Sequence, residues 1–213
     1  MGIAKYNYNL DFFNCDSEEL YYFLGFVAAD GYINNKDIEI GLNKKDIDIL
    51  IRFRDLIVPN KPLYNKESTD SYTLKISNKN IALKIKSYFQ MTTNKKSNEL
   101  CFPNVPSTYV KDFIRGYVDG DGCIDTTKGY YKDKIYIGAR LRILSNEKFL
   151  IALNDKIKEF YKHNTNAINK KGKENVYVVT YNFSTAKNIL IWLYKNSHIH
   201  LERKYEAAMC LVG

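Results

Sequence analysis

The chain has 213 residues, 45% of them hydrophobic, which is enough to build the core of one large domain or of two small, similar ones. Lys and Arg total 32 and Asp and Glu total 24, so the net charge is +8. This charge favours a polyanionic partner such as nucleic acid. The alternative is a basic enzyme without such a partner. No run approaches the roughly 18 apolar residues of a membrane span and the start lacks a secretory signal's apolar core, so we expect an intracellular protein without a membrane partner.

The first half of the chain predicts helices and strands in the order αββαββα. Asp16, Ser17, Glu18 and Glu19 form a capping sequence, which predicts a helix that runs to residue 30 and stops at Gly31. Apolar residues then alternate with polar ones over 37–42, as in a half-buried strand. The elements that follow are an amphipathic helix over 44–58, a hairpin over 61–77 and a second amphipathic helix over 80–89.

The second half repeats this order. Pro106 and Ser107 begin a helix that stops at Gly122. A strand over 134–144 places one set of side chains on an apolar face and another on a basic face: Ile135, Ile137, Leu141 and Ile143 on the first, Arg140 and Arg142 on the second. The remaining elements are helices over 147–161 and 185–196, a hairpin over 169–183 and a tail helix over 200–211.

The two halves predict two similar subdomains. We expect the first over residues 1–91 and the second, with the tail helix, over 107–213. Residues 92–106 form a short connector that contains Pro103 and Pro106, too short to act as a long flexible linker.

A short stretch occurs once in each half, as FLGFVAADGYI over 23–33 and IRGYVDGDGCI over 114–124. Gly25 and Ala29 are four residues apart, as are Gly116 and Gly120, so each pair lies on one face of its helix. A face of small residues lets another backbone come very close. We therefore expect the two helices to pack against each other about a pseudo-two-fold axis, and the chain to be a monomer because both faces are used within it.

This packing would bring Asp30 and Asp121 together at two helix C-termini, where negative charge is disfavoured. Two carboxylates about 4 Å apart repel by roughly 4 kcal/mol at an effective dielectric of 20. A divalent cation such as Mg²⁺ reverses this balance, so the sequence predicts a metal site for phosphate chemistry at the joint. The alternative is that both Asp-Gly pairs are simply helix-ending turns. His198 and His200 have no third ligand nearby, and we expect them to be structural or solvent-facing.

FLGFVAADG and IRGYVDGDG resemble the two motif copies of the LAGLIDADG homing endonuclease family, in its single-chain, two-motif form. The order of elements around each copy also fits, so the resemblance covers nearly the whole chain. It implies an α+β fold with αββαββα repeated twice, motif helices at the central interface and antiparallel sheets that form a saddle for DNA. It also implies that Asp30 and Asp121 are catalytic and bind metal together with the backbone carbonyls of Ala29 and Gly120.

The resemblance further implies a basic residue near each metal site. The matching stretches are NKKS, with Lys95 and Lys96, and LERKY, with Arg203 and Lys204; we take Lys96 and Lys204 as the candidates. A cation there would stabilise the pentavalent phosphate or help polarise the attacking water. The alternatives are a solvated linker and a solvated helix face.

The resemblance also implies a polar residue that positions water at the end of each early strand, for which the candidates are Asn43 and Ser145. Mg²⁺ is the implied cofactor, as two or three divalent cations, with Mn²⁺ substituting and Ca²⁺ binding without cleavage. One difference between the copies is Ala28, where the second copy has Asp119. That position is not the family's essential acid, so we expect no effect on activity.

The polar faces of the strands are the expected DNA surface if the apolar faces meet the helices, because strands in the major groove can read base edges. The candidates are Thr73, Lys75 and Ser77, with Glu39 and Asn43, in the first half, and Tyr136, Arg140, Arg142, Thr180 and Asn182 in the second. Lys170, Lys171 and Lys173 at a hairpin turn suit phosphate contacts. The alternative for any one of them is an ordinary surface residue.

These features predict a site-specific, Mg²⁺-dependent DNA endonuclease that hydrolyses one phosphodiester in each strand of a long, asymmetric target. Halves that differ on their polar faces suit an asymmetric double-stranded site, whereas a homodimer would need a palindrome. Two alternatives share the fold: an intron maturase that binds its host intron RNA, and a non-cleaving nucleic-acid-binding protein. A regulator on a decayed scaffold predicts loss of an acid, and both acids are present.

Overall fold

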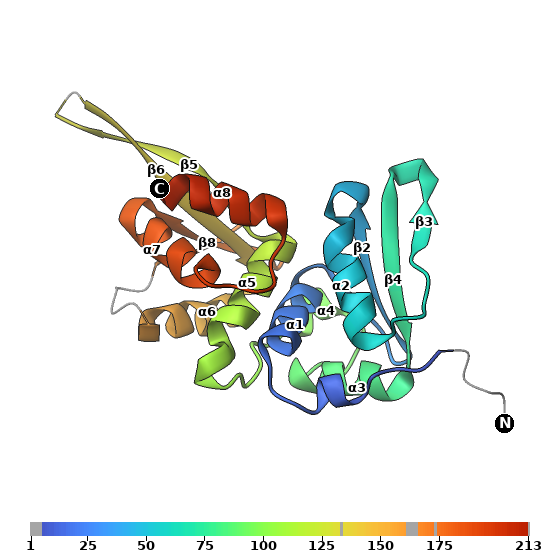
Figure 1. Ribbon diagram of the computed structural model, residues 1–213. Helices are drawn as coiled ribbons and strands as arrows, with labels where there is room; N and C mark the ends of the chain where they lie inside the picture. The colour runs from blue at the N-terminus through green and yellow to red at the C-terminus, as the bar shows by residue number, and fades with distance from the viewer. Residues whose placement is uncertain (1–5, 133, 161–165, 173, 213) are drawn as a thin grey trace.

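The computed structural model describes residues 6–132, 134–160, 166–172 and 174–212, which form two halves on either side of a central pair of helices (Figure 1). The first half consists of α1 (Glu18–Asp30), β1 (Tyr32–Ile33), β2 (Asp37–Asn43), α2 (Ile47–Ile57), β3 (Tyr64–Lys66), β4 (Ser71–Ser77) and α3 (Lys79–Tyr88). The second consists of α5 (Val110–Asp121), β5 (Cys123–Tyr131), β6 (Lys134–Ser145), α6 (Glu147–Phe160), β7 (Ile168–Lys170), β8 (Tyr177–Asn182), α7 (Phe183–Tyr194) and α8 (Glu202–Val212). Both halves follow the predicted αββαββα order. The expected connector contains a further helical turn, α4 (Lys96–Glu99).

The two motif helices begin and end as the sequence predicts. The Ser17 hydroxyl caps α1 by accepting a hydrogen bond from the backbone N–H of Leu20 at 3.1 Å. Gly31 and Gly122 terminate α1 and α5, but both adopt extended backbone with negative φ, so a left-handed conformation is not what requires glycine there. A Cβ at either position would lie 2.7 Å from the carbonyl oxygen four residues earlier, and lack of space is therefore the reason.

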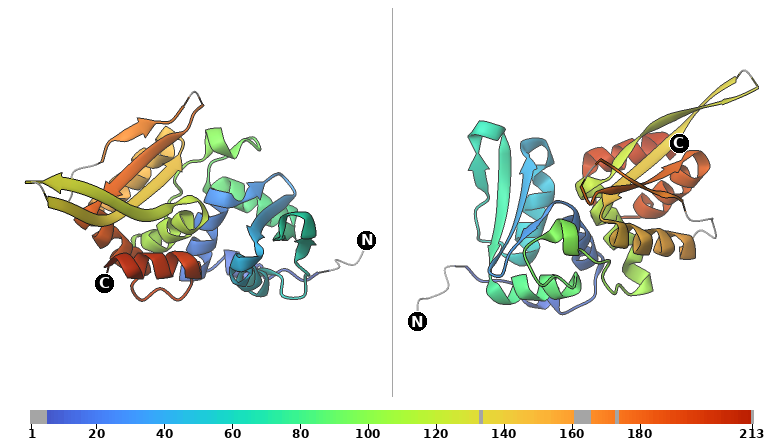
Figure 2. Two further views of the ribbon diagram at one scale, coloured as in Figure 1. Left: turned by 90° about the horizontal axis from the view of Figure 1, so that it is seen from above. Right: turned by 180° about the vertical axis from the view of Figure 1, so that it is seen from behind.

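Each half contains one four-stranded antiparallel sheet, with orders β1-β2-β4-β3 and β5-β6-β8-β7. One face of each sheet is apolar and packs on helices; in β2 this face consists of Ile38, Ile40 and Leu42. The opposite face carries the polar side chains. The matching strand order shows that the chain is built from one unit used twice, and the two sheets flank the central helices (Figure 2).

Helices α1 and α5 pack closely along their small-residue faces. A Cβ built on Gly25 would lie 2.0 Å from the carbonyl oxygen of Phe113, and one built on Gly116 would lie 2.1 Å from that of Tyr22. These contacts recur 91 positions along the chain (25 to 116, 22 to 113), so they are related by the pseudo-two-fold axis. Near the helix ends, a Cβ on Gly120 would meet the Cβ of Ala29 at 2.5 Å.

The β5–β6 hairpin differs from the expectation. Ile135 and Ile137 share the face of Leu141 and Ile143, but their exposed fractions are 60% and 67%, whereas Leu141 and Ile143 are fully buried. The hairpin runs past the last helix and projects from the body of the molecule, so the outer part of its apolar face has nothing to pack on (Figures 1 and 2). Among the described residues, every helix is too short or too polar to span a bilayer.

Candidate active site at the joint of the two halves

Asp30 and Asp121 are the last residues of α1 and α5, and the packing of the two helices brings both acids to the same joint. Partial burial raises the pKa of both carboxyl groups above their usual value. The negative charge of Asp121 raises the pKa of Asp30 further, while Lys96 and Lys204 lower the pKa of each acid. The two carboxylates therefore share one electrostatic environment with two lysines.

The two lysines occupy equivalent places beneath the acids. Lys96 donates from Nζ to the carbonyl oxygens of Val27 (3.2 Å), Ala29 (2.8 Å) and Gly31 (2.6 Å). Lys204 donates from Nζ to those of Val118 (2.7 Å) and Gly122 (2.8 Å). Val118 and Gly122 are the counterparts of Val27 and Gly31, so each ammonium neutralises the negative end of one motif helix.

Burial lowers the pKa of Lys96 and of Lys204 to about 8, and the nearby acids oppose this shift. Neither lysine is a freely solvated side chain: Lys204 is 7% exposed and Lys96 is half-buried. Lys95 is exposed and Arg203 forms an ion pair elsewhere. In each of the two basic stretches, therefore, only one residue lies at the joint: Lys96 in the first and Lys204 in the second.

A cavity of about 220 Å³ opens beside Asp121 and is also lined by Lys96, Ser145 and Tyr117, among others. Ser145 and Tyr117 both line this cavity, and the Tyr117 hydroxyl donates to the carbonyl oxygen of Leu144 at 2.9 Å. Asn43 ends β2, and its carboxamide oxygen accepts from the backbone N–H of Lys45. Ser145 therefore faces the site directly, whereas the contact of Asn43 is local.

The donors at the joint fit a hard divalent cation. The expected donors are two carboxylates and the carbonyl oxygens of Gly120 and Ala29, and the carbonyl oxygen of Ala29 already accepts one hydrogen bond from Lys96. No group of three His, Cys, Asp or Glu suited to a metal occurs among the described residues, so a Zn²⁺-type site is not indicated. Mg²⁺ retains several waters and needs only one or two carboxylates, which agrees with this donor set.

The polar faces of the sheets carry the side chains that the sequence analysis assigned to DNA. Thr73, Lys75 and Ser77 lie on β4, Tyr136, Arg140 and Arg142 on β6, and Thr180 and Asn182 on β8, each on the face away from the buried residues. Lys170 and Lys171 are exposed where β7 ends, and Lys173 lies outside the described residues.

Several of these basic side chains are held by acids. Lys75 pairs with Glu39 across the strands at 2.5 Å. Arg140 donates from Nε and Nη2 to both oxygens of Asp125 at 2.7 Å, and Arg142 donates to the same carboxylate at 2.7 Å. Asp125 was not among the predicted DNA-binding residues; its position opposite Arg140 in an antiparallel pair was the available signal.

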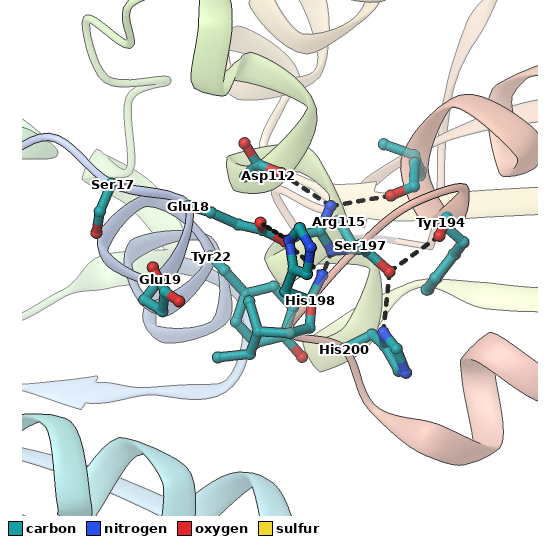
Figure 3. Close-up of polar contacts among 12 residues, drawn as sticks. Ser17, Glu18, Glu19, Tyr22, Asp112, Arg115, Tyr194, Ser197, His198 and His200 are labelled. Atoms are coloured by element: carbon teal, nitrogen blue, oxygen red, sulfur yellow. Dashed lines mark hydrogen bonds and ion pairs between the residues drawn. The ribbon is translucent and has the colours of Figure 1, made fainter.

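Two of the buried charged residues of α5 have contacts that the sequence did not reveal. Arg115 is fully buried and bonds Asp112, Glu18 and the carbonyl oxygens of Leu193 and Ile199 (Figure 3). Asp119 is 1% exposed and accepts three hydrogen bonds. Each is a charged residue within an otherwise buried helix, and such a charge requires partners. His198 and His200 contact Glu18 and Ser197 near this cluster rather than the joint.

Comparisons with known proteins agree with this architecture. Residues 114–208 match the sequence model of the LAGLIDADG endonuclease family. The fold of the chain is similar to that of the I-LtrWI LAGLIDADG homing endonuclease bound to target DNA, with a TM-score of 0.59, 14% identity and coverage of 95% of this chain and 90% of that one. I-SmaMI bound to uncleaved target DNA with calcium ions gives a TM-score of 0.65 at 13% identity, covering 92% of this chain and 89% of that one.

I-SmaMI bound to cleaved DNA gives a TM-score of 0.62 at 12% identity, covering 92% and 87% of the two chains. A search of curated proteins by sequence gives no match. The family model covers the second motif copy, and the pseudo-two-fold packing of α1 on α5 supplies the first copy in the same fold. The second half of the chain thus matches the LAGLIDADG endonuclease family model, and the whole chain has the fold of single-chain LAGLIDADG homing endonucleases with two motif helices.

Proposed function

We propose that this protein is a site-specific DNA endonuclease that hydrolyses one phosphodiester in each strand of a long, asymmetric double-stranded target. The observation that carries the proposal is the duplicated set of one acid and one lysine at the joint, Asp30 with Lys96 and Asp121 with Lys204. Two related sets about a pseudo-two-fold axis match two scissile phosphates on antiparallel strands. The relatives I-LtrWI and I-SmaMI, whose structures contain target DNA, support the same class of activity.

Asp30 and Asp121 would hold Mg²⁺, with the carbonyl oxygens of Gly120 and Ala29 as further donors. When bound, the metal supplies Lewis acidity at the scissile phosphate and lowers the pKa of attacking water. The two or three cations and the Mn²⁺ and Ca²⁺ behaviour implied by the resemblance remain predictions.

The lysines supply positive charge where negative charge grows during attack on phosphorus. Burial lowers the pKa of each lysine to about 8, which is closer to neutral pH than that of an ordinary lysine. Ser145 lies in the cavity beside Asp121 and can orient water there. We give Asn43 the matching role in the first half, on its position at the end of β2.

The DNA surface of this proposal is the polar face of both sheets. Its guanidinium and ammonium groups are not loose: Asp125 holds Arg140 and Arg142, and Glu39 holds Lys75. Arg side chains fixed in this way suit bidentate contacts to guanine. Because the residues differ between the halves, the target would be asymmetric and a monomer would suffice to bind it.

The test is incubation of the protein with Mg²⁺ and the DNA that flanks its own gene, joined as if the gene were absent. A double-strand cut at one position, abolished by EDTA, is the expected result. Asp30→Asn and Asp121→Asn should still bind this DNA, since the contact surface lies on the sheets. Tight binding by the wild-type protein with no cut in either strand would support the non-cleaving binder or the maturase instead.

A further inference from the structure

The structure assigns a positioning role to Asp119: it fixes the first turn of α8 and thereby holds Lys204 at the joint. Asp119 is a buried carboxylate of the second motif helix, two residues before Asp121. The inference rests on the proposed function, because the role of Lys204 in cleavage belongs to that proposal. The position of Lys204 itself does not depend on the proposal.

The hydrogen bonds of Asp119 reach three different elements. Its Oδ2 accepts from the hydroxyl of Tyr22 on α1 at 2.7 Å and from the backbone N–H of Leu201 at 2.7 Å. Its Oδ1 accepts from the hydroxyl of Tyr194 at the end of α7 at 2.5 Å. One carboxylate thus joins α5 to α1, to α7 and to the residue just before α8. Hydrogen bonds to an ionised acceptor are stronger than those between neutral groups.

The bond to Leu201 controls where α8 starts. The carbonyl oxygen of Leu201 accepts from the N–H groups of Lys204 (2.9 Å) and Tyr205 (3.0 Å), so Leu201 caps the first turn of the helix. Lys204 lies within that turn, with its Nζ on the carbonyl oxygens of Val118 and Gly122. One helical turn therefore connects the anchored residue to the ammonium group.

The segment that precedes Leu201 is fixed on its other side, but further from the lysine. Glu18 accepts from the backbone N–H of His198 at 2.9 Å, and the Nε of Arg115 donates to the carbonyl oxygen of Ile199 at 2.9 Å (Figure 3). Arg203 adds a bond to Asp46 of the first half, through a side chain that is 46% exposed. Within the first turn of α8, Asp119 makes the buried, charge-assisted contact.

The first half lacks this arrangement. Its motif helix has Ala28 in place of Asp119, and Lys96 lies on the four-residue α4 of the connector. Replacing Asp119 should therefore affect the Lys204 site and leave the Lys96 site unchanged. This asymmetry distinguishes a positioning role from a general contribution to folding.

The direct test compares the chemical reactivity of the two lysines in metal-free protein without DNA, by trace acetylation with acetic anhydride and mass spectrometry. In Asp119→Ala we expect Lys204 to react about tenfold faster than in wild type and Lys96 to react at the same rate. Loss of one charge-assisted hydrogen bond can raise the population of molecules with an exposed Lys204 by about this factor. Asp119→Asn removes the same negative charge, which also raises the pKa of Lys204, but it keeps an acceptor for Tyr22 and Leu201. Lys204 should therefore react more slowly in Asp119→Asn than in Asp119→Ala, and the difference between the two variants measures the loss of positioning. Equal protection of Lys204 in folded Asp119→Ala protein would overturn the inference.

Two further variants are controls for this test. Asp112→Asn alters another buried carboxylate of α5, bound to Arg115 at 2.9 Å, and should leave both lysines protected. If it exposes Lys204 as strongly, the effect of Asp119 is general loosening and the inference fails. If Asp119→Ala does not fold, the variant Tyr22→Phe/Tyr194→Phe/Asp119→Leu removes the carboxylate together with both hydroxyls and leaves fewer orphaned polar groups. The same rise at Lys204 is expected from it, and its absence refutes the anchor.

The readout on the reaction is strand-resolved cleavage of end-labelled target DNA. Asp119→Ala should slow, by about tenfold, the cut in the strand that Lys204→Met also slows, and should leave the other strand at the wild-type rate. Equal rates on both strands would refute a positioning effect on the reaction. If the wild-type protein cuts neither strand, the proposed endonuclease fails, while the acetylation result still decides whether Asp119 positions Lys204.

Discussion

The close packing of α1 on α5 makes Gly116→Ala a sharp test of the joint. The new Cβ would lie 2.1 Å from the carbonyl oxygen of Tyr22 and 2.9 Å from the backbone N of Phe26, about 1.3 Å inside the 3.4 Å at which ordinary contacts begin (3.4 − 2.1). Both obstructing atoms are backbone, so no side chain can rotate away and the helices must separate. Overpacking of this kind costs roughly 1–3 kcal/mol or more.

Alanine also has an intrinsic advantage over glycine within a helix, of roughly 1 kcal/mol. Taking the upper end of the overpacking cost, we expect a net loss of about 2 kcal/mol in the free energy of unfolding, measured by urea denaturation. Gly41→Ala is the matched control, because its Cβ would meet only the Thr73 hydroxyl oxygen at 3.4 Å, and its stability should change by no more than about 0.5 kcal/mol. A Gly116→Ala protein as stable as wild type would show that the helices do not pack this closely.

Three other changes have defined outcomes. Hydrogen bonds from Thr93 and Thr92 lower the pKa of Glu99 to about 2. A carboxyl group whose pKa is lower in the folded than in the unfolded chain stabilises the folded state while it is ionised. The contribution of Glu99 to the free energy of unfolding is therefore present above about pH 4.5 and is lost as the pH falls towards 2. Acid unfolding followed by circular dichroism should therefore show less pH dependence in Glu99→Gln over this range, and an unchanged profile would exclude the effect. Asp125→Ala releases Arg140 and Arg142 and removes one negative charge, so the protein should bind random DNA more tightly and select its target sequence less strictly. Selection from a randomised DNA library measures this preference. Retention of the wild-type sequence preference would argue against the Asp125 contacts. In single-turnover assays, Lys96→Met should slow cleavage of one strand by about 100-fold, while its affinity for the target DNA stays within about threefold of wild type. An equal fall in the cleavage rate of both strands would show that the two lysine sites do not act independently.

The parts of this structure that depend on local pattern could be predicted from sequence. The repeated stretch, with small residues four apart and an acid before glycine, was enough to place α1 against α5 and both acids at the joint. The same holds for Ile38, Ile40 and Leu42, whose alternation marks the buried face of β2. In β2 the determining residues are close together in the chain, so their spacing alone carries the information. The α1–α5 contact joins residues far apart in the chain and could be predicted because the same stretch occurs twice.

The contacts that the sequence did not reveal join residues far apart in the chain. The partners of Asp119 are Tyr22, Tyr194 and Leu201, and nothing in the local sequence indicates that these surround one carboxylate. Ile135 and Ile137 fit the pattern of a buried face, yet they lie where the hairpin has passed its helices. The alternation of residues predicts which face of a strand is apolar. How far the helices cover that face depends on the rest of the fold.

We propose that Asp30 and Asp121 belong to two related cleavage sites at one joint. The decisive measurement is strand-resolved, single-turnover cleavage of the flanking-DNA target with Mg²⁺, comparing wild type, Asp30→Asn, Asp121→Asn and the double variant. We expect wild type to cut both strands at defined phosphates, and each variant to bind the target with an affinity within about threefold of wild type while losing double-strand cleavage. Wild-type double-strand cleavage by either single variant would show that the acid at the end of that helix has no part in the reaction.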